Sequence, residues 1–294
     1  MNTVRILVAG LFGFGGTVLI GFFTLITATL YHLLIGWWAP KRWYNPAEHM
    51  PHLWAHFLTE VGIRRIAGIN IKVSGFVSVA SENELVLCMA NHPADIPLVA
   101  LVDLITSRIH WHFISVVKRE HMRNPFFGRA LRQIGGAIPI DRGNATAAFG
   151  QIKEDMARIR APAVLLILPD RRRPTPERIS EDIIKYIGRI PGIERWLKHT
   201  LVPASGGLRT ILLEQPNIRI VNATVGFVPS APSGLGRFAK GTIHIELRTE
   251  HGLPKEEAAL QTWLLEEWQR KHQLIDHWFY ENHAAHLRPT LPTA

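Results

Sequence analysis

A histidine and an aspartate lie at the point where an apolar strand is expected to end. Residues 84–90 form the apolar run, and Asn91, His92 and, three positions further, Asp95 follow it. A histidine held at a strand exit can act as a general base, because its ordinary pKa lies close to neutrality. A carboxylate one helical turn away can orient the neutral tautomer and stabilise the imidazolium. The structural alternative places Asp95 in the first turn of a helix, where a carboxylate interacts favourably with the helix dipole.

Arginines follow two further apolar runs. Arg142 stands just beyond residues 137–140, and Asp170 follows residues 163–168. Three consecutive arginines come next: Arg171, Arg172 and Arg173. A guanidinium binds phosphate through paired hydrogen bonds, so these residues are candidates for an anion site; a solvated basic loop is the alternative. Ligands of open α/β sheets bind at the carboxyl ends of the strands, which would bring these groups to one edge.

The elements that must position these groups alternate between strands and helices, which predicts an α/β fold. We expect a mixed, largely parallel sheet flanked by helices over residues 45–287, with a disordered tail at 288–294. The predicted strands are 69–76, 84–90, 110–117, 137–140, 163–168, 218–227 and 242–248. The predicted helices are 47–67, 94–106, 124–134, 145–160, 183–199 and 254–280. The last helix carries one apolar stripe, which consists of Leu260, Trp263, Leu264, Trp268, Leu274 and Ile275.

The N-terminal segment is apolar and the chain as a whole is basic. Residues 6–38 contain no Asp, Glu, Lys or Arg, and this run exceeds the roughly 20 residues that one membrane crossing needs. Trp37, Trp38, Trp43 and Tyr44 form an aromatic belt beside it. We therefore expect a membrane anchor at residues 1–44, a single hydrophobic helix or a helical hairpin. The net charge of +9 favours either nucleic acid or an anionic lipid surface as partner, and the apolar segment favours the bilayer.

Several other classes of site are not supported. The single Cys88 lies in an apolar run, which predicts a buried residue rather than a nucleophile and excludes an internal disulfide. His49, His52 and His56 share a helical spacing, but Pro51 interrupts it and no acidic or cysteine ligand accompanies them, so we expect no metal site. The chain has no Walker-type glycine loop and no Gly-x-Ser-x-Gly motif. It also has no RNA-module signature, so the positive net charge is the only feature that would indicate a nucleic-acid binder.

The order and spacing of these blocks resemble the glycerolipid acyltransferase family, in particular the lysophosphatidic acid acyltransferases and their lysocardiolipin acyltransferase branch. The resemblance extends from the apolar segment to about Asp276, and it rests on an ordered set of short motifs. These are Asn91-His92 with Ala94-Asp95-Ile96, Lys118, Asn124-Pro125-Phe126-Phe127-Gly128, residues 136–142, Pro169-Asp170 with Arg173, Thr175-Pro176-Glu177-Arg178, Val202-Pro203 with Gly206-Gly207, Asn222-Ala223-Thr224-Val225 and the Trp-Leu-Leu-Glu-Glu-Trp stretch from Trp263.

The resemblance implies a membrane-bound enzyme that moves a fatty acyl group from an acyl thioester, acyl-CoA or acyl-carrier protein, to the free hydroxyl of lysophosphatidic acid or a related lysophospholipid. It implies His92 as the general base and Asp95 as its partner. The implied phosphate-binding set comprises Lys118, Arg142 and Arg173, with Arg171 and Arg172 as further candidates and Asp170 positioning the cations. We expect no metal, no bound cofactor and no nucleic-acid partner. The expected location is a bacterial inner membrane, with the catalytic domain on its cytoplasmic face.

Two motifs depart from the family pattern. The family has four residues between its histidine and aspartate, whereas two separate His92 from Asp95. Positions three apart lie about 60° apart around a helix, so contact between the side chains is still feasible. The family's Pro-Glu-Gly-Thr-Arg block reads Pro-Asp-Arg-Arg-Arg from Pro169, so Arg171 replaces a glycine. These departures leave a non-catalytic lipid-binding relative with a degenerate site as the alternative.

Overall fold

The structure is a computed structural model that describes residues 46–92, 95–124, 128, 131, 136–141, 143–228 and 241–287. It also describes single residues and short stretches of the N-terminal segment, at 15, 19, 22–24, 26, 27, 29, 30, 33 and 34. Most of the expected anchor and the tail at 288–294 lie outside the described residues. Within the described part of the chain, no helix is long and apolar enough to cross a membrane.

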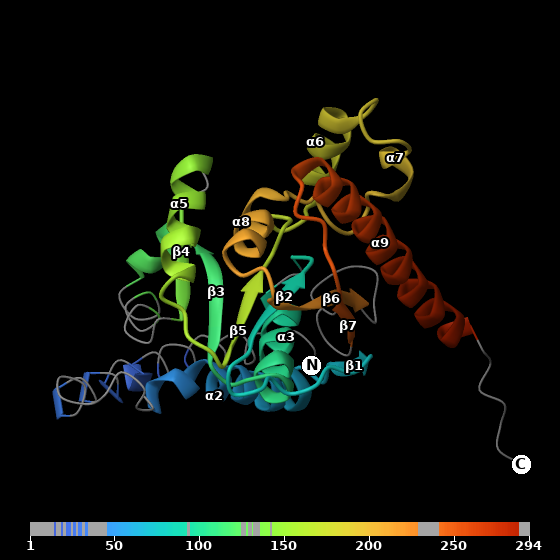
Figure 1. The fold of residues 1–294 in the computed structure, drawn as a ribbon. Coiled ribbons are helices and arrows are strands. Elements are labelled where there is room, and N and C mark those ends of the chain that lie inside the picture. The colour runs from blue at the N-terminus through green and yellow to red at the C-terminus, as the bar shows by residue number, and fades with distance from the viewer. Residues whose placement is uncertain are drawn as a thin grey trace, which may run out of the picture.

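Seven strands of the described chain form one sheet (Figure 1). In chain order they are β1 (Asn70–Ser74), β2 (Leu85–Ala90), β3 (Phe113–Lys118), β4 (Ala137–Ile140), β5 (Ala163–Ile167), β6 (Arg219–Val228) and β7 (Thr242–Glu250). The order across the sheet is β1-β7-β6-β2-β5-β3-β4, and β6–β7 is the antiparallel pair. The predicted mixed, largely parallel sheet is confirmed, and β6, β2, β5, β3 and β4 all end at the same edge.

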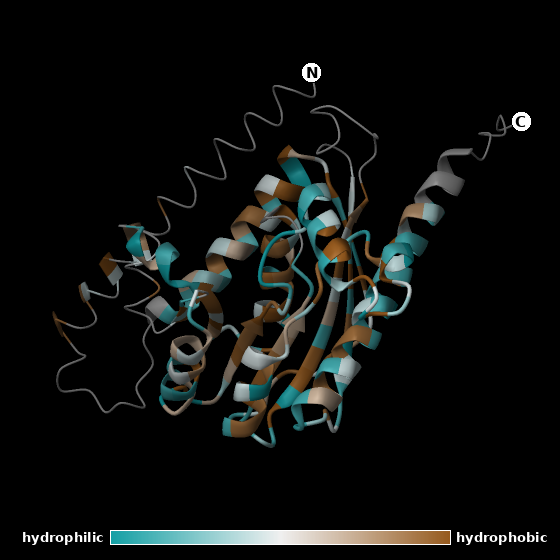
Figure 2. Ribbon diagram, turned by 90° about the horizontal axis from the view of Figure 1, so that it is seen from above, coloured by the Kyte–Doolittle hydropathy of each residue, from teal (hydrophilic) through white to brown (hydrophobic). Residues whose placement is uncertain are grey.

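Helices cover both faces of this sheet. One face packs on α2 (Met50–Phe57), the π-helical η3 (Leu58–Ile66) and α3 (Asp95–Arg108); the other packs on α5 (Ala145–Met156), α8 (Gly206–Glu214) and α9 (Glu257–Leu287). The sheet and the helix surfaces that face it carry the apolar residues (Figure 2). Along β2, Cys88 joins the core on the α3 side while Leu87 and Met89 join the core of α8 and α9, because successive side chains point to opposite faces. The prediction of a buried Cys88 is confirmed, and burial raises the pKa of its thiol to about 12.

The predicted stripe on the last helix is confirmed as the surface that packs on the sheet. Its members Leu260, Leu264, Trp268 and Ile275 are buried in α9. Trp263 and Leu274 are partly buried against the same cores. In Figure 1 this helix runs beside β6 and β7 and continues past the sheet. The C-terminal helix is therefore part of the globular fold.

Three predicted elements differ from the structure. The helix predicted at 183–199 is wrong: α6 spans Pro176–Tyr186 and the short α7 spans Ile193–Trp196, with Gly188 and Gly192 at positive φ between them. The hydroxyl of Thr175 accepts from Arg178 N at 3.3 Å and caps α6, so this part of the motif is a helix start. The proline and the paired glycines of residues 201–208 predict a turn, yet α8 begins within this segment at Gly206. The predicted 47–67 helix is divided into the 3₁₀ turn η2 (Pro46–His49), α2 and η3.

Around β3 and β4 the comparison is incomplete. A 3₁₀ turn, η4 (Arg119–Arg123), follows β3 and was not predicted. Of the helix expected over residues 124–134, the described residues Gly128 and Leu131 are helical and the others, apart from Asn124, lie outside the described residues. Leu131 packs with Met122 in a small apolar cluster that also includes Val117. The described residues therefore link this segment to the end of β3.

Candidate active site

The ends of β2 and β5 bring His92 and Asp170 together. These strands are parallel neighbours in which Met89 pairs with Ile167, and each of the two residues lies three positions beyond that pair. The main-chain N–H of His92 donates to Oδ2 of Asp170 at 2.8 Å. The expectation that these two blocks meet at one edge of the sheet is thus met by the structure.

Asn91 fixes the backbone immediately before His92. Its side-chain Nδ2 donates to the carbonyl of Val225 at 2.8 Å, and its Oδ1 accepts from Val225 N at 2.8 Å. The last backbone pair between β2 and β6 joins Ala90 to Ala223. The Asn91 side chain therefore adds hydrogen bonds between the two chain segments just beyond the end of the backbone pairing. Asn91 is buried, and both bonds are made in a place where an unpaired amide would be costly. His92 therefore leaves the strand from a fixed point.

Asp170 is a buried carboxylate whose two oxygens each accept from an N–H group. Oδ2 accepts from His92 N, and Oδ1 accepts from the indole Nε1 of Trp268 on α9. Its exposed fraction is 1 %, and burial raises its pKa to about 7 against the lowering effect of both hydrogen bonds and of the Lys271 ammonium. The described contacts of this carboxylate are with the His92 backbone and with α9. Its predicted role of positioning the arginines stays a prediction.

Lys271 lies about one helical turn after Trp268 on α9 and is also buried. Its Nζ donates to the carbonyl of Ala223 at 2.6 Å and lies 4.7 Å from the centre of the Trp268 ring. Burial lowers the pKa of this ammonium to about 8, while Glu267 and Asp170 favour its charged form. Trp268 was predicted as an apolar stripe residue and Lys271 was not singled out. The sequence signal that could have identified these two residues is an indole and a lysine within one turn of a helix that otherwise buries apolar side chains.

The three consecutive arginines form a tight, exposed turn after Asp170. Arg171 N donates to the carbonyl of Leu168 at 3.1 Å, and Arg172 N donates to the carbonyl of Asp170 at 2.6 Å. The φ angle of Arg171 is 61°, in the left-handed region that glycine adopts most readily. The side chain of Arg172 lies 3.8 Å from Glu181, and the carbonyl of Arg173 accepts from Arg178. All three arginines are exposed at this edge of the sheet.

Of the remaining predicted site residues, the structure describes Lys118 and the backbone of Asp95, and Arg142 lies outside the described residues. Lys118 ends β3, the neighbour of β5, and forms an ion pair of 2.6 Å with Glu120. Arg142 lies outside the described residues, two positions after the last residue of β4. Asp95 is the first residue of α3, and its side chain also lies outside the described part. The His92–Asp95 dyad therefore stays a prediction.

The histidines of the N-terminal helix lie away from this strand edge and contact α3 and the loop before β3. Nδ1 of His52 lies 3.0 Å from Thr106 Oγ1, and Nδ1 of His56 lies 3.1 Å from Asp103 Oδ1. His49 stacks on Trp111 with ring centres 3.7 Å apart. Among the described residues, no group of histidine, cysteine or acidic side chains is arranged to hold a metal ion.

Comparisons with known proteins identify a solved structure with a similar fold. A scan against protein-family models and a search of curated proteins both return no match. Among solved structures, the chain is similar to the crystal structure of the 1-acyl-sn-glycerophosphate (LPA) acyltransferase PlsC from Thermotoga maritima. The two chains are 11% identical, the match covers 93% of this chain and 97% of that one, and the TM-score is 0.60. At this identity the likeness establishes a shared fold over nearly the whole of both chains.

Proposed function

We propose that this protein is a membrane-bound acyltransferase that moves a fatty acyl group from an acyl thioester to the free hydroxyl of lysophosphatidic acid or a related lysophospholipid. The observation that carries the proposal is the junction of His92 with Asp170 at a strand edge that also bears exposed arginines. A base and an anion site side by side suit an acceptor that has both a hydroxyl and a phosphate. The fold shared with an LPA acyltransferase supports the same reaction class. The lysocardiolipin branch stays a suggestion of the sequence motifs alone.

His92 would supply the proton transfer. Its imidazole takes the proton of the acceptor hydroxyl, and the resulting alkoxide attacks the thioester carbonyl to form a tetrahedral intermediate. The intermediate collapses by breaking the carbon–sulfur bond, and the imidazolium returns the proton to the departing thiolate. Asp95 would orient the ring, as the motif predicts. No acyl-enzyme is needed, because transfer is direct. Cys88 is not placed as a nucleophile, since it is buried and its thiol has a raised pKa.

The acceptor phosphate would bind the cations at the same edge. Lys118 ends the strand beside β5, and the turn after Asp170 carries three exposed guanidiniums. Arg142 would join them from the end of β4. Several cations close together repel one another, and a phosphate dianion offsets that repulsion through charge-assisted hydrogen bonds. We assign Arg173 the principal role with Lys118 and Arg142, and Arg171 and Arg172 a supporting one.

Exposed apolar side chains support contact with a bilayer. The described part of the N-terminal segment exposes large residues: Leu19, Phe22, Phe23, Leu30, Leu33 and Leu34. Beside the strand edge, Ile184 and Ile187 are 76% and 57% exposed and lie among the exposed cations Lys185 and Arg189. Cations that flank apolar side chains suit binding to an anionic lipid surface. Each such Lys or Arg near the surface contributes about 1 kcal/mol to the binding free energy. We place the protein on the cytoplasmic face of a bacterial inner membrane.

The direct test is thiol release from oleoyl-CoA by the purified, detergent-solubilised full chain. The reaction is run with and without lysophosphatidic acid, and beside the His92→Ala variant. The proposal predicts release that requires the acceptor and is lost in the variant. Acyl-carrier protein loaded with palmitate and other lysophospholipids serve as further donor and acceptor arms. If every pair fails for the wild type, the proposed reaction is wrong.

The second candidate is a non-catalytic lipid-binding relative. The observation in its favour is Arg171, which adopts a glycine-like φ of 61° in the block where the family pattern has glycine. This candidate predicts binding to lysophosphatidic acid vesicles without thiol release. It also predicts that His92→Ala leaves vesicle binding unchanged. Acceptor-dependent release by the wild type would rule it out.

A further inference from the structure

The C-terminal helix contacts the Asp170 carboxylate, which in turn contacts the main chain of His92. Asp170 bridges two N–H donors that are far apart in the sequence, the main chain of His92 and the indole of Trp268. Both carboxylate oxygens act as acceptors, an arrangement that fits the ionised form of Asp170. Asp170 is 1% and Trp268 is 0% exposed, and His92 is partly exposed. A change in the position of the indole N–H would therefore shift the Asp170 carboxylate and, through it, the His92 backbone.

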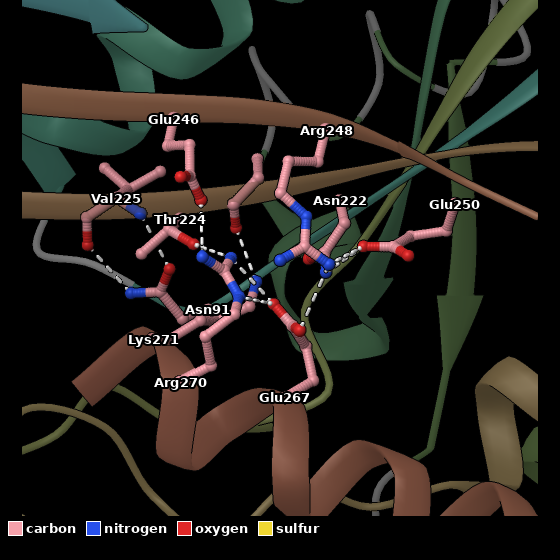
Figure 3. A network of polar contacts seen from close by, with 11 residues as sticks. Asn91, Asn222, Thr224, Val225, Glu246, Arg248, Glu250, Glu267, Arg270 and Lys271 are labelled. Atoms are coloured by element: carbon pink, nitrogen blue, oxygen red, sulfur yellow. Dashed lines mark hydrogen bonds and ion pairs between the residues drawn. The ribbon is translucent and has the colours of Figure 1, made fainter. Parts of the chain in front are cut away.

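The position of α9 relative to the sheet is set by directional polar contacts (Figure 3). Arg270 pairs with Glu267 on its own helix at 2.8 Å and with Glu246 on β7 at 2.8 Å, and it donates to Thr224 on β6 at 3.1 Å. Glu267 also faces Arg248 on β7 at 3.4 Å. Glu267 is buried, and Arg270, Glu246 and Arg248 are partly exposed. Hydrogen-bonded charge pairs constrain the relative position of two elements because each contact is directional.

The same network reaches the strand that bears His92. Lys271 donates to the carbonyl of Ala223 at 2.6 Å, and Ala223 pairs with Ala90, the last residue of β2. Two steps further along β6, Val225 holds the Asn91 side chain. The helix thus contacts β6 next to the point where β6 fixes Asn91, and it contacts the Asp170 turn through Trp268. The two attachments lie on either side of the His92 backbone.

We infer that Trp268 is a positioning residue for the general base His92, acting through the carboxylate of Asp170. This inference rests on the proposed function for the role of His92, and it assigns to the C-terminal helix a part in the reaction that neither the sequence motifs nor the shared fold assigns. Trp268 does not touch the reacting atoms. It holds one carboxylate oxygen so that the other fixes the His92 main chain and, with it, the direction in which the imidazole leaves the strand.

The electrostatics of the bridge give the inference a signature in pH. The groups that face Asp170 are Lys271 of α9, which lowers its pKa, and Asp182 of α6, which raises it, together with the His92 and Trp268 N–H donors. Removing the indole N–H removes one lowering influence, so the pKa of Asp170 rises above about 7. A larger fraction of Asp170 is then protonated at neutral pH. The acidic limb of the pH–rate profile moves to higher pH as a result.

The test is Trp268→Phe, which keeps an aromatic ring in the core and removes the indole N–H. The matched control is Trp278→Phe on the same helix, where the ring is also buried and stacks on His244 with ring centres 4.9 Å apart. For Trp268→Phe we expect kcat to fall about tenfold, with the KM for lysophosphatidic acid within about twofold of the wild type and the acidic limb moved to higher pH. Trp278→Phe should keep the wild-type profile. Equal profiles for the two variants, or a change confined to KM, would overturn the inference.

A readout without turnover separates this inference from the proposed function. Hydrogen exchange of the His92 amide, followed in a peptide that covers residues 89–92, reports the Asp170 contact directly. We expect faster exchange in Trp268→Phe than in the wild type and in Trp278→Phe. If the wild type transfers no acyl group but the exchange difference is present, the proposed function fails while the positioning contact stands. If the wild type is active and both the exchange and the pH profile are unchanged, the inference alone is wrong.

Discussion

The main-chain N–H of His92 lies 2.8 Å from Oδ2 of Asp170, and this hydrogen bond joins the ends of two neighbouring parallel strands. Each residue lies three positions beyond the Met89–Ile167 pair, so the register of the sheet itself brings them level. The carboxylate of Asp170 therefore holds the main chain of His92. The two motifs act as one unit because strand register, and not sequence distance, sets their separation.

The protonation of Asp170 should make stability depend on pH. Its folded-state pKa is raised from 3.8 to about 7, mainly by burial, so the folded protein binds this proton more tightly than the unfolded chain does. The corresponding contribution to stability is present at low pH and is lost as the pH rises from 3.8 through about 7. Over this interval we expect the free energy of unfolding of the wild type to fall more steeply than that of Asp170→Asn. Urea unfolding at several pH values measures both slopes.

The control for this comparison is Glu82→Gln, which changes an exposed acid in the turn before β2. It should keep the steep slope of the wild type. A wild-type slope equal to that of Asp170→Asn would show that Asp170 is ionised in the folded state throughout the interval, contrary to its burial.

The folded protein should be more stable with glycine in place of Arg171. Its φ of 61° places the Cβ of an L-residue close to the following carbonyl oxygen, and glycine avoids that contact. Relief of strain contributes about 1–2 kcal/mol and the added freedom of the unfolded chain costs about 0.5–1 kcal/mol, so we expect Arg171→Gly to raise the free energy of unfolding by roughly 0.5–1 kcal/mol. The neighbouring Arg172→Gly should instead lower it by about 0.5–1 kcal/mol, because glycine adds freedom to the unfolded chain without relieving strain. Chemical denaturation of the two variants should therefore give shifts of opposite sign, and shifts of the same sign would contradict this account.

Arg173 should act on acceptor binding. Loss of one charge-assisted contact to a phosphate costs about 1.4 kcal/mol, so Arg173→Ala should raise the KM for lysophosphatidic acid about tenfold. The effect should shrink with an acceptor that lacks the phosphate. Arg158→Ala is a suitable control, because Arg158 is an exposed arginine that follows α5 and pairs with Asp155. Steady-state kinetics for both acceptors decide the matter, and an equal rise in KM for both variants would argue against a phosphate site at Arg173.

The fold was predictable in outline because its strands have strong local signals. Continuous apolar runs such as residues 163–168 indicate strands that are buried on both faces, and β5 is buried along its whole length. The α6–α7 region was not predictable in the same way. Thr175 and Pro176 start a helix there by capping, although the resemblance drew attention to them only as one block of an ordered set of motifs. The helical start at Gly206 was missed because paired glycines favour turns on their own.

The candidate site was predictable where strand topology decides it. His92 and Asp170 follow parallel strands and Lys118 is the last residue of another, and parallel strands end at one edge. The contributions of Trp268 and Asn91 could not be predicted, because each depends on a contact across the fold: Trp268 is 98 residues from Asp170 in the chain and Asn91 is 134 from Val225. An indole on an apolar stripe gives no sign of the acceptor that its N–H will meet. Only the packing of α9 on the sheet supplies it.

The central claim is that His92 drives acyl transfer to a lysophospholipid, and product analysis tests it most directly. The full chain is incubated with isotopically labelled oleoyl-CoA and lysophosphatidic acid, and the diacyl product is detected by mass spectrometry. His92→Gln is compared with His277→Gln, which changes an exposed histidine far along α9. The account predicts labelled diacyl product from the wild type and His277→Gln, and loss of at least about a hundredfold in His92→Gln. Labelled product formed equally by both variants would contradict the assignment of His92 as the general base.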